Sequence, residues 1–213
     1  MKKVAVFSLV FLLYLFVNCV DNNPISTYET NSGKIKRILQ YNPEEELEFY
    51  LVFNYNNEGL KTKILQYNSS DQLFGYNTFE YIKNRTISKQ YASLSLDGSF
   101  DLSRYYISEH DQKGNEVKMS IYNASEQLIE YYVNEFDIEN KIVKELMYNK
   151  SDKLEKYYLY KYNDKGENSY TFTYNDSDVV FKYSKSEYDS KGNIIKETVF
   201  CEGIIIYYLV YEY

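Results

Sequence analysis

The feature that most restricts what this chain can fold into is an internal repeat of 26 residues. A glycine, or once an asparagine, marks each unit, and consecutive markers are 26 residues apart except across the stretch between residues 59 and 114. The markers are Gly33, Gly59, Gly114, Asn140, Gly166 and Gly192. Tandem units of this length are supersecondary modules that bury their apolar surface against neighbouring units. The spacing predicts about seven units, the last one cut short at the C-terminus.

Aromatic residues recur at fixed distances from each marker. One ring stands four residues before the marker, as in Tyr55 and Tyr162, and another stands eight residues after it, as in Tyr67 and Tyr174. Nine residues after that second ring a tyrosine recurs: Tyr50, Tyr76, Tyr105, Tyr131, Tyr157 and Tyr183. We expect these markers and tyrosines to be structural, the former at turns and the latter in a ladder on the sheet.

The stretch 82–113 is the irregular part of the array. Counting back from Gly114 puts about three extra residues between Tyr81 and Ser88. The same count places Leu96 and Asp97 where other units have Tyr-Asn.

Two turn signals alternate along the chain, separated by runs of strand length. One reads YNNEG, YNDKG or YDSKG, and an Asp or Asn that opens a type I turn closed by Gly predicts a bulged hairpin. The other reads YNSSD, YNASE or YNKSD, and we expect a slightly longer connection there. The composition agrees with strands, because 27 Tyr and 12 Phe accompany only 2 Pro.

The sequence therefore predicts an all-β fold, an antiparallel meander of about 13–14 strands with no helix after the N-terminal segment. A single sheet must bury its apolar residues against something. We expect one curled or partly open sheet with tyrosines covering its faces, since the ring is apolar and the hydroxyl tolerates water. A closed barrel and a β-solenoid are the alternatives, and the hairpin turns count against the solenoid.

The first 18 residues have the pattern of a secretory signal. Lys2 and Lys3 precede an apolar run from Val4 to Val17, which is short for a membrane span of about 20 residues. We expect a signal peptide at 1–18, a tether at 19–27 and a repeat domain at 28–213.

Cys19 directly after this apolar run resembles the lipobox cysteine of bacterial lipoproteins, including the relaxed boxes of spirochaetes, with Phe16 at −3 and Asn18 at −1. The resemblance implies that Cys19 is acylated, with palmitate among the chains, and becomes the first residue of an exported protein anchored to a bacterial membrane. The outer membrane or the cell surface is the expected location, rather than the inner membrane.

The array of Tyr-Asp/Asn-x-x-Gly, a ring and Tyr-Asn, over about residues 28–213, is similar to the YD-repeat family of Rhs and wall-associated bacterial proteins. This second resemblance implies successive hairpins that extend one curling sheet.

Residues typical of catalysis or metal binding are few. His110 is the one histidine, in the ring slot before Gly114, and Cys201 is left without an intramolecular partner if Cys19 is acylated. We therefore predict no catalytic residue, no metal and no cofactor. A hydrolase with two scattered carboxylates is the alternative. A net charge of −7 argues against nucleic acid as a partner.

A basic residue stands four positions after most markers: Arg37, Lys63, Lys118, Lys144 and Lys196. We interpret this stripe as solvated strand cations that discourage edge pairing, with an anion-binding groove as the alternative.

The expected function is that of a non-catalytic envelope lipoprotein whose tyrosine-rich sheet is a binding or scaffolding surface for a glycan, a peptide or a host protein. The alternatives are a periplasmic lipoprotein for lipid handling or envelope assembly, and a glycan-acting hydrolase.

Overall fold

The computed structural model describes residues 34–92 and 99–213 as a single antiparallel sheet of 14 strands. The strands are β1 (Arg37–Tyr41), β2 (Leu47–Tyr55), β3 (Lys61–Asn68), β4 (Leu73–Ile82), β5 (Arg85–Ala92), β6 (Asp101–His110), β7 (Glu116–Asn123), β8 (Leu128–Phe136), β9 (Ile142–Asn149), β10 (Leu154–Tyr162), β11 (Asn168–Asn175), β12 (Val180–Tyr188), β13 (Ile194–Cys201) and β14 (Ile204–Glu212). Within these ranges no residue is helical, and no helix suited to crossing a bilayer is found.

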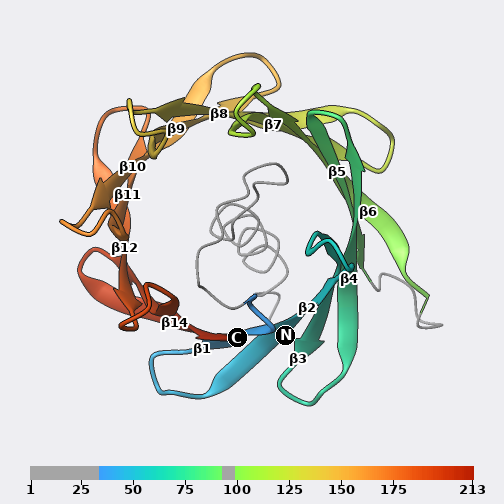
Figure 1. The fold of residues 1–213 in the computed structure, drawn as a ribbon, viewed down its shortest axis with the longest axis horizontal. Coiled ribbons are helices and arrows are strands. Elements are labelled where there is room, and N and C mark those ends of the chain that lie inside the picture. Colours follow the sequence, from blue (N-terminus) through green and yellow to red (C-terminus); the bar gives the residue numbers. More distant parts are fainter. Residues whose placement is uncertain (1–33, 93–98) are drawn as a thin grey trace, which may run out of the picture.

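The sheet closes into a barrel (Figure 1). Each strand pairs with the next along the chain, and β1 pairs with both β2 and β14, so that Leu39 lies opposite Tyr50 on one side and Val210 on the other. The expectation of a partly open sheet is wrong, and the closed alternative is correct. Closure pairs the two edges that an open meander would leave as rows of free amides and carbonyls.

The two turn signals form the same turn. After β2 the amide of Gly59 donates to the carbonyl of Asn56 over 3.0 Å, and after β3 the amide of Asp71 donates to the carbonyl of Asn68 over 3.1 Å. In both turns the Oδ1 of the asparagine accepts two further backbone amides. The expectation that the second connection is longer is therefore wrong. The two turns differ in the residue that closes them.

These closing residues distinguish the two ends of the barrel, because alternate turns of a meander lie at opposite ends. At one end, the glycine rim, the described markers have φ between 79° and 89°: Gly59, Gly114, Gly166 and Gly192. Asn140 takes the same role at 62°, and Gly33 lies outside the described residues. At the other end, the acidic rim, the left-handed position holds Glu45, Asp71, Glu126, Asp152 and Asp178, with φ between 59° and 67°.

The irregular stretch is resolved by the register of β4 and β5. A short turn at Lys83 and Asn84 joins these strands, and Tyr91 of β5 stacks on Tyr76 of β4 with ring centroids 4.8 Å apart. Tyr91, and not Leu96, occupies the second ring slot. This turn has two residues, as does the turn between β13 and β14, and the extra residues fall in the connection between Ala92 and Asp101.

Alternate side chains face the two sides of the wall. The face that carries the fully buried side chains, such as Leu51 and Ile121 at 0% exposure, lines the inside of the closed sheet. Two apolar clusters lie on this inner face, one across β1–β3 and β13–β14 and the other across β6–β10. Between them, on β3–β5 and on β11–β12, the inner positions are mostly polar, for example Gln66, Asn77 and Thr173.

Candidate functional site

A belt of aromatic rings encircles the outer face, one ring on each strand. The rings form seven cross-strand stacked pairs with centroids 4.6–5.2 Å apart. The pairs are Tyr41–Tyr208, Tyr50–Tyr67, Tyr76–Tyr91, Tyr105–Tyr122, Tyr131–Tyr148, Tyr157–Tyr174 and Tyr183–Phe200. The recurrent tyrosines of the sequence are thus on β2, β4, β6, β8, β10 and β12, each stacked on a ring of the following strand. Aromatic pairs of this kind add roughly 0.5–1.5 kcal/mol each beyond burial.

The belt accounts for the three aspartates at left-handed positions of the acidic rim, each of which accepts a tyrosine hydroxyl. The hydroxyl of Tyr50 donates to Oδ1 of Asp71 over 2.7 Å, and Tyr157 donates in the same way to Asp178 over 2.8 Å. Burial and the hydrogen bond to Asp178 raise the pKa of Tyr157 to about 12. A charge-assisted bond of this kind offsets the strain of a non-glycine residue at positive φ.

The basic stripe lies against the same belt. Each cation sits over the recurrent ring of the next strand, 4.2–4.6 Å from its centroid: Arg37 over Tyr50, Lys63 over Tyr76, Lys118 over Tyr131, Lys144 over Tyr157 and Lys196 over Tyr208. The stripe is therefore a set of cation–π caps, and the barrel has no edge for it to protect. Neither the edge-protecting role nor an open anion groove describes these contacts.

Two of the seven units depart from this rule, and in one of them Ile87 on β5 holds the slot, opposite Ile107 as Lys63 is opposite Thr78. In the other, Tyr170 on β11 occupies the basic slot, and Phe172 packs against Tyr183 with centroids 6.0 Å apart. Tyr170 contacts Phe172 at 5.9 Å, and Tyr183 stacks on Phe200 at 4.6 Å. These four rings form a continuous row across β11–β13, which we call the outer aromatic strip.

Most exposed apolar side chains fall in the same part of the sequence as this strip. Of the ten exposed large apolar side chains among the described residues, eight lie between residues 170 and 206. They are Tyr170, Val179, Val180, Phe181, Ile195, Ile204, Ile205 and Ile206. Exposed apolar patches on a soluble surface mark interaction sites more often than isolated apolar residues do.

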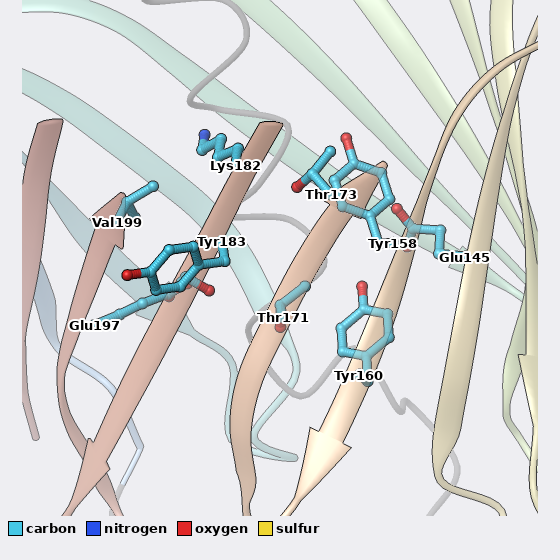
Figure 2. A pocket seen from close by; sticks show the side chains of 10 residues that line it. Glu145, Tyr158, Tyr160, Thr171, Thr173, Lys182, Tyr183, Glu197 and Val199 are labelled. Carbon is cyan, nitrogen blue, oxygen red and sulfur yellow. The ribbon is translucent and has the colours of Figure 1, made fainter. Parts of the chain in front are cut away.

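A pocket lies on the inner wall of the same part of the barrel (Figure 2). It has a volume of about 30 Å³ and is lined from five strands, β9 to β13, by Glu145, Tyr158, Tyr160, Thr171, Thr173, Lys182, Tyr183, Ser184, Glu197 and Val199. We call it the inner pocket. Figure 2 shows Glu145 and Glu197 toward opposite sides, with Thr171 and Thr173 between them.

Both carboxyls of the inner pocket are buried, with Glu145 3% and Glu197 8% exposed. Burial and the neighbouring carboxylate of Glu116 raise the pKa of Glu145 to about 8, against the attraction of Lys156. Burial also raises the pKa of Glu197, although Ser184 and Tyr211 hydrogen-bond to it. The Tyr211 hydroxyl donates to Oε2 of Glu197 over 3.1 Å.

The lysines of this wall interact with neighbouring carboxyl and hydroxyl groups. Burial lowers the pKa of Lys156 to about 8, against the attraction of Glu130 and Glu145. Lys182 donates from Nζ to the Tyr207 hydroxyl over 3.3 Å. The wall therefore carries paired charges in a largely buried setting, where Coulomb interactions are stronger than in water.

The remaining sequence candidates have simpler surroundings. His110 is buried in its ring slot, and its Nδ1 lies 3.4 Å from the carbonyl oxygen of Asn84. Cys201 ends β13 as a half-buried free thiol, and Cys19 lies outside the described residues. In residues 34–92 and 99–213 no group of three or more His, Cys, Asp and Glu could hold a metal ion.

The sequence reasoning missed the inner pocket. Apart from Tyr183, its lining residues follow no 26-residue rule, because the repeat fixes the outer rings and the turns. Polar residues at alternate positions of β11, Thr171 and Thr173, were the available signal.

No protein-family model matches the chain, and no curated protein matches it. Among solved structures, a porin-like protein from Bacteroides uniformis aligns with 10% identity over 84% of this chain and 97% of its own, with a TM-score of 0.48. A porin-like protein from Bacteroides vulgatus aligns with 10% identity over 84% of this chain and 98% of its own, with a TM-score of 0.46. A DUF1329 family protein from Desulfovibrio piger aligns with 11% identity over 96% of this chain and 90% of its own, with a TM-score of 0.29. At these scores the likenesses carry no argument about function.

Proposed function

We propose that this protein is a non-catalytic envelope lipoprotein that binds a glycan chain on its outer aromatic strip. The observation that carries the proposal is the aromatic residue Tyr170 in the cation slot beside Tyr183, which extends the stacked pair into a row of four rings. In five other units a lysine or arginine covers the ring that a ligand would need, and in the β5 unit the slot holds Ile87, which adds no further ring.

The chemistry of the strip suits a sugar. A pyranose has an apolar C–H face that can lie on an aromatic ring while its hydroxyls stay in water. Tyr170 and Tyr183 add hydroxyls that can hydrogen-bond at the rim of such a contact. A row of four rings across three strands presents successive platforms, which favours a chain of sugars over a single one.

The two alternative functions have weaker support. A lipid carrier needs a cavity large enough for an acyl chain, whereas the inner pocket has a volume of only about 30 Å³. A glycan hydrolase needs two carboxyls on one concave wall, which Glu145 and Glu197 supply. It also needs one acid protonated and the other ionised, and here burial raises the pKa of both.

The lipid anchor and the relation to YD-repeat proteins are part of the same proposal. Acylation of Cys19 would keep the barrel at a membrane surface, where its outer face meets wall or matrix glycans. Metabolic labelling with an alkyne fatty acid tests this, with Cys19→Ser as the control expected to lose the label. Protease treatment of intact cells then separates a surface location, where the protein is digested, from a periplasmic one, where it is protected.

The binding test exchanges residues between two equivalent units. Tyr170→Lys supplies the strip with the cap of the other units, and Lys144→Tyr makes the opposite exchange 26 residues earlier. Hexamers of the chitin, cellulose and amylose series would be titrated calorimetrically. We expect one series to bind the unaltered protein, at least tenfold weaker binding to Tyr170→Lys, and undiminished binding to Lys144→Tyr.

Equal affinity of the unaltered protein and Tyr170→Lys would remove the strip as the site. Absence of binding to every series would overturn a glycan ligand of these classes. Release of shorter sugars during the titration would instead support the hydrolase.

A further inference from the structure

The connections at the two ends of the barrel differ in charge. At the acidic rim, the six connections that the structure describes in full hold nine acidic and two basic side chains. At the glycine rim, the six connections and the two lysines that lead into β1, Lys34 and Lys36, hold seven of each. One end of the barrel is therefore strongly acidic, and the other is balanced.

Exposure shifts the glycine rim further toward positive charge. Six of its seven cations are exposed, whereas four of its seven acids are half-buried. The half-buried acids include Asp111 and Asp189, whose Oδ1 atoms each accept two backbone amides of their own turns. All eleven charged side chains of the acidic-rim connections are exposed. The two rims therefore present opposite signs of charge to anything that lies beyond the ends of the barrel.

An apolar side chain lies at the glycine rim among these cations. Ile138, in the turn between β8 and β9, is fully exposed, at 100%. Nζ of Lys113 donates to Oδ1 of Asn140 in the same turn over 2.9 Å, and Nζ of Lys141 lies 2.7 Å from Oε2 of Glu139. A bilayer interface accommodates this combination, because the apolar side chain enters the acyl boundary while the ammonium groups stay at the phosphates.

The chain enters the barrel at the same rim. β1 runs from the glycine rim to the acidic rim, since the acidic-rim turn at 42–46 follows it, and the amide of Lys36 donates to the carbonyl of Glu212 over 2.6 Å. Lys34 lies 15 positions after Cys19, a distance of about 50 Å for a fully extended chain. A lipid on Cys19 would therefore hold the glycine rim nearer to a bilayer than the acidic rim.

We infer that the glycine rim is the face of the barrel that contacts the bilayer, with Ile138 among the headgroups, lysines at anionic phosphates and the acidic rim directed away. The inference rests on the lipid anchor of the proposed function, and it leaves the outer aromatic strip on the side wall open to a glycan. The acidic rim has exposed apolar side chains of its own, such as Ile204 at 70%. However, Glu202 and Asp178, in the turns before β14 and β12, would bring carboxylates to the same phosphates, so that anionic lipid disfavours this rim.

The chain contains no tryptophan, so a single introduced tryptophan reports which rim meets lipid. Ile138→Trp and Ile204→Trp place this probe at exposed positions on opposite rims. The acylated proteins would be added to vesicles of three parts phosphatidylcholine to one part phosphatidylglycerol, prepared with and without bromine on the acyl chains. Brominated chains are expected to quench the emission of Ile138→Trp at least twofold and to leave that of Ile204→Trp unchanged.

Matched pairs of lysines test the role of charge. Lys165→Glu with Lys191→Glu reverses two exposed charges at the glycine rim, and Lys150→Glu with Lys153→Glu reverses two at the acidic rim. In the Ile138→Trp protein the first pair is expected to reduce the quenching at least twofold, because it replaces attraction to phosphatidylglycerol by repulsion. The second pair is expected to leave the quenching unchanged.

Three results would overturn the inference: quenching of Ile204→Trp as strong as that of Ile138→Trp, quenching of neither, or no loss of quenching with the glycine-rim pair. Fatty-acid labelling of the same preparations separates this failure from a failure of the anchor. Labelled protein without quenching of Ile138→Trp contradicts only the orientation, whereas an unlabelled Cys19 contradicts the anchor and the inference together.

Discussion

The outer and inner faces of the same 14 strands follow different rules. On the outer face every strand contributes one belt ring, and five units place a cation over the next ring. On the inner face the residues at equivalent positions differ from strand to strand, from Ile121 on β7 to Met147 on β9 and Thr173 on β11. The 26-residue period is thus a property of the outer face and of the turns. The inner face carries the local differences that give each part of the barrel its own chemistry.

The largest expected effect comes from truncating a leucine on each face. Leu51 is fully buried in an inner apolar cluster, whereas Leu146 is half-buried on the outer face opposite Tyr157. Leu51→Ala should lower the free energy of unfolding by about 3 kcal/mol and Leu146→Ala by about 1 kcal/mol, because the cavity term applies to the enclosed site. Urea unfolding followed by tyrosine fluorescence measures both. Equal losses would mean that the two faces are packed alike.

The inner carboxyl Glu145 should respond in the opposite direction. Its pKa is raised to about 8 in the folded protein, so the native state holds a proton that the unfolded chain releases above about pH 4.5. Stability from this group is therefore fully present below pH 4.5 and is lost as the pH rises toward 8. Glu145→Gln should raise the free energy of unfolding at pH 8 by about 1–3 kcal/mol and leave it nearly unchanged at pH 4.

The matched outer control is Glu135, which is exposed and lies opposite Lys144. Glu135→Gln is expected to change stability by no more than about 0.5 kcal/mol at either pH. A pH-independent effect of Glu145→Gln would show that the inner wall does not hold this proton.

An intermediate effect is expected for the bond that joins the belt to the acidic rim. Asp71→Ala removes the acceptor of the Tyr50 hydroxyl and leaves an alanine at φ 59°, whereas Asp71→Gly removes only the acceptor. We expect the alanine variant to be about 1 kcal/mol less stable than the glycine variant. A cycle of Tyr50→Phe and Asp71→Gly should give a coupling of about 1 kcal/mol. Additive effects would mean that the bond contributes nothing.

The fold was predictable from the sequence because the repeat fixes turns and outer rings through short-range rules. The Asn-x-x-Gly turn and the 26-residue spacing predict hairpins and their order, and the strand total agrees with the 14 observed. Closure was not predictable, because pairing of Arg37–Tyr41 with β14 depends on how twist and strand number combine over the whole sheet. The ring slot of β5 was assigned to Leu96 instead of Tyr91. The turn before β5 is shorter than in most units and the connection after it is longer, so counting residues back from Gly114 misplaces the slot.

The two candidate sites were predictable to different degrees, because the repeat fixes the outer face and not the inner one. The outer strip is visible in the sequence as Tyr170 in a slot that holds Arg or Lys in five other units. The inner pocket is not, because Glu145 and Glu197 belong to strands four apart and meet only through the curvature of the wall. Residues that share a site without sharing a period leave no signal in a single chain.

The smallest expected effect tests why Tyr170 departs from the rule of its own face. Lys118→Met keeps the aliphatic part of the side chain over Tyr131 and removes the charge, so it should cost about 0.5 kcal/mol. Tyr170→Lys places a charge over Tyr183 and should gain a similar amount, both read from urea unfolding under identical conditions. A stabilising Tyr170→Lys that abolishes glycan binding would mean that the natural residue gives up stability for a ligand. A destabilising one would mean instead that the four rings of the strip are packed for their own sake, and the reason for the departure would then be structural.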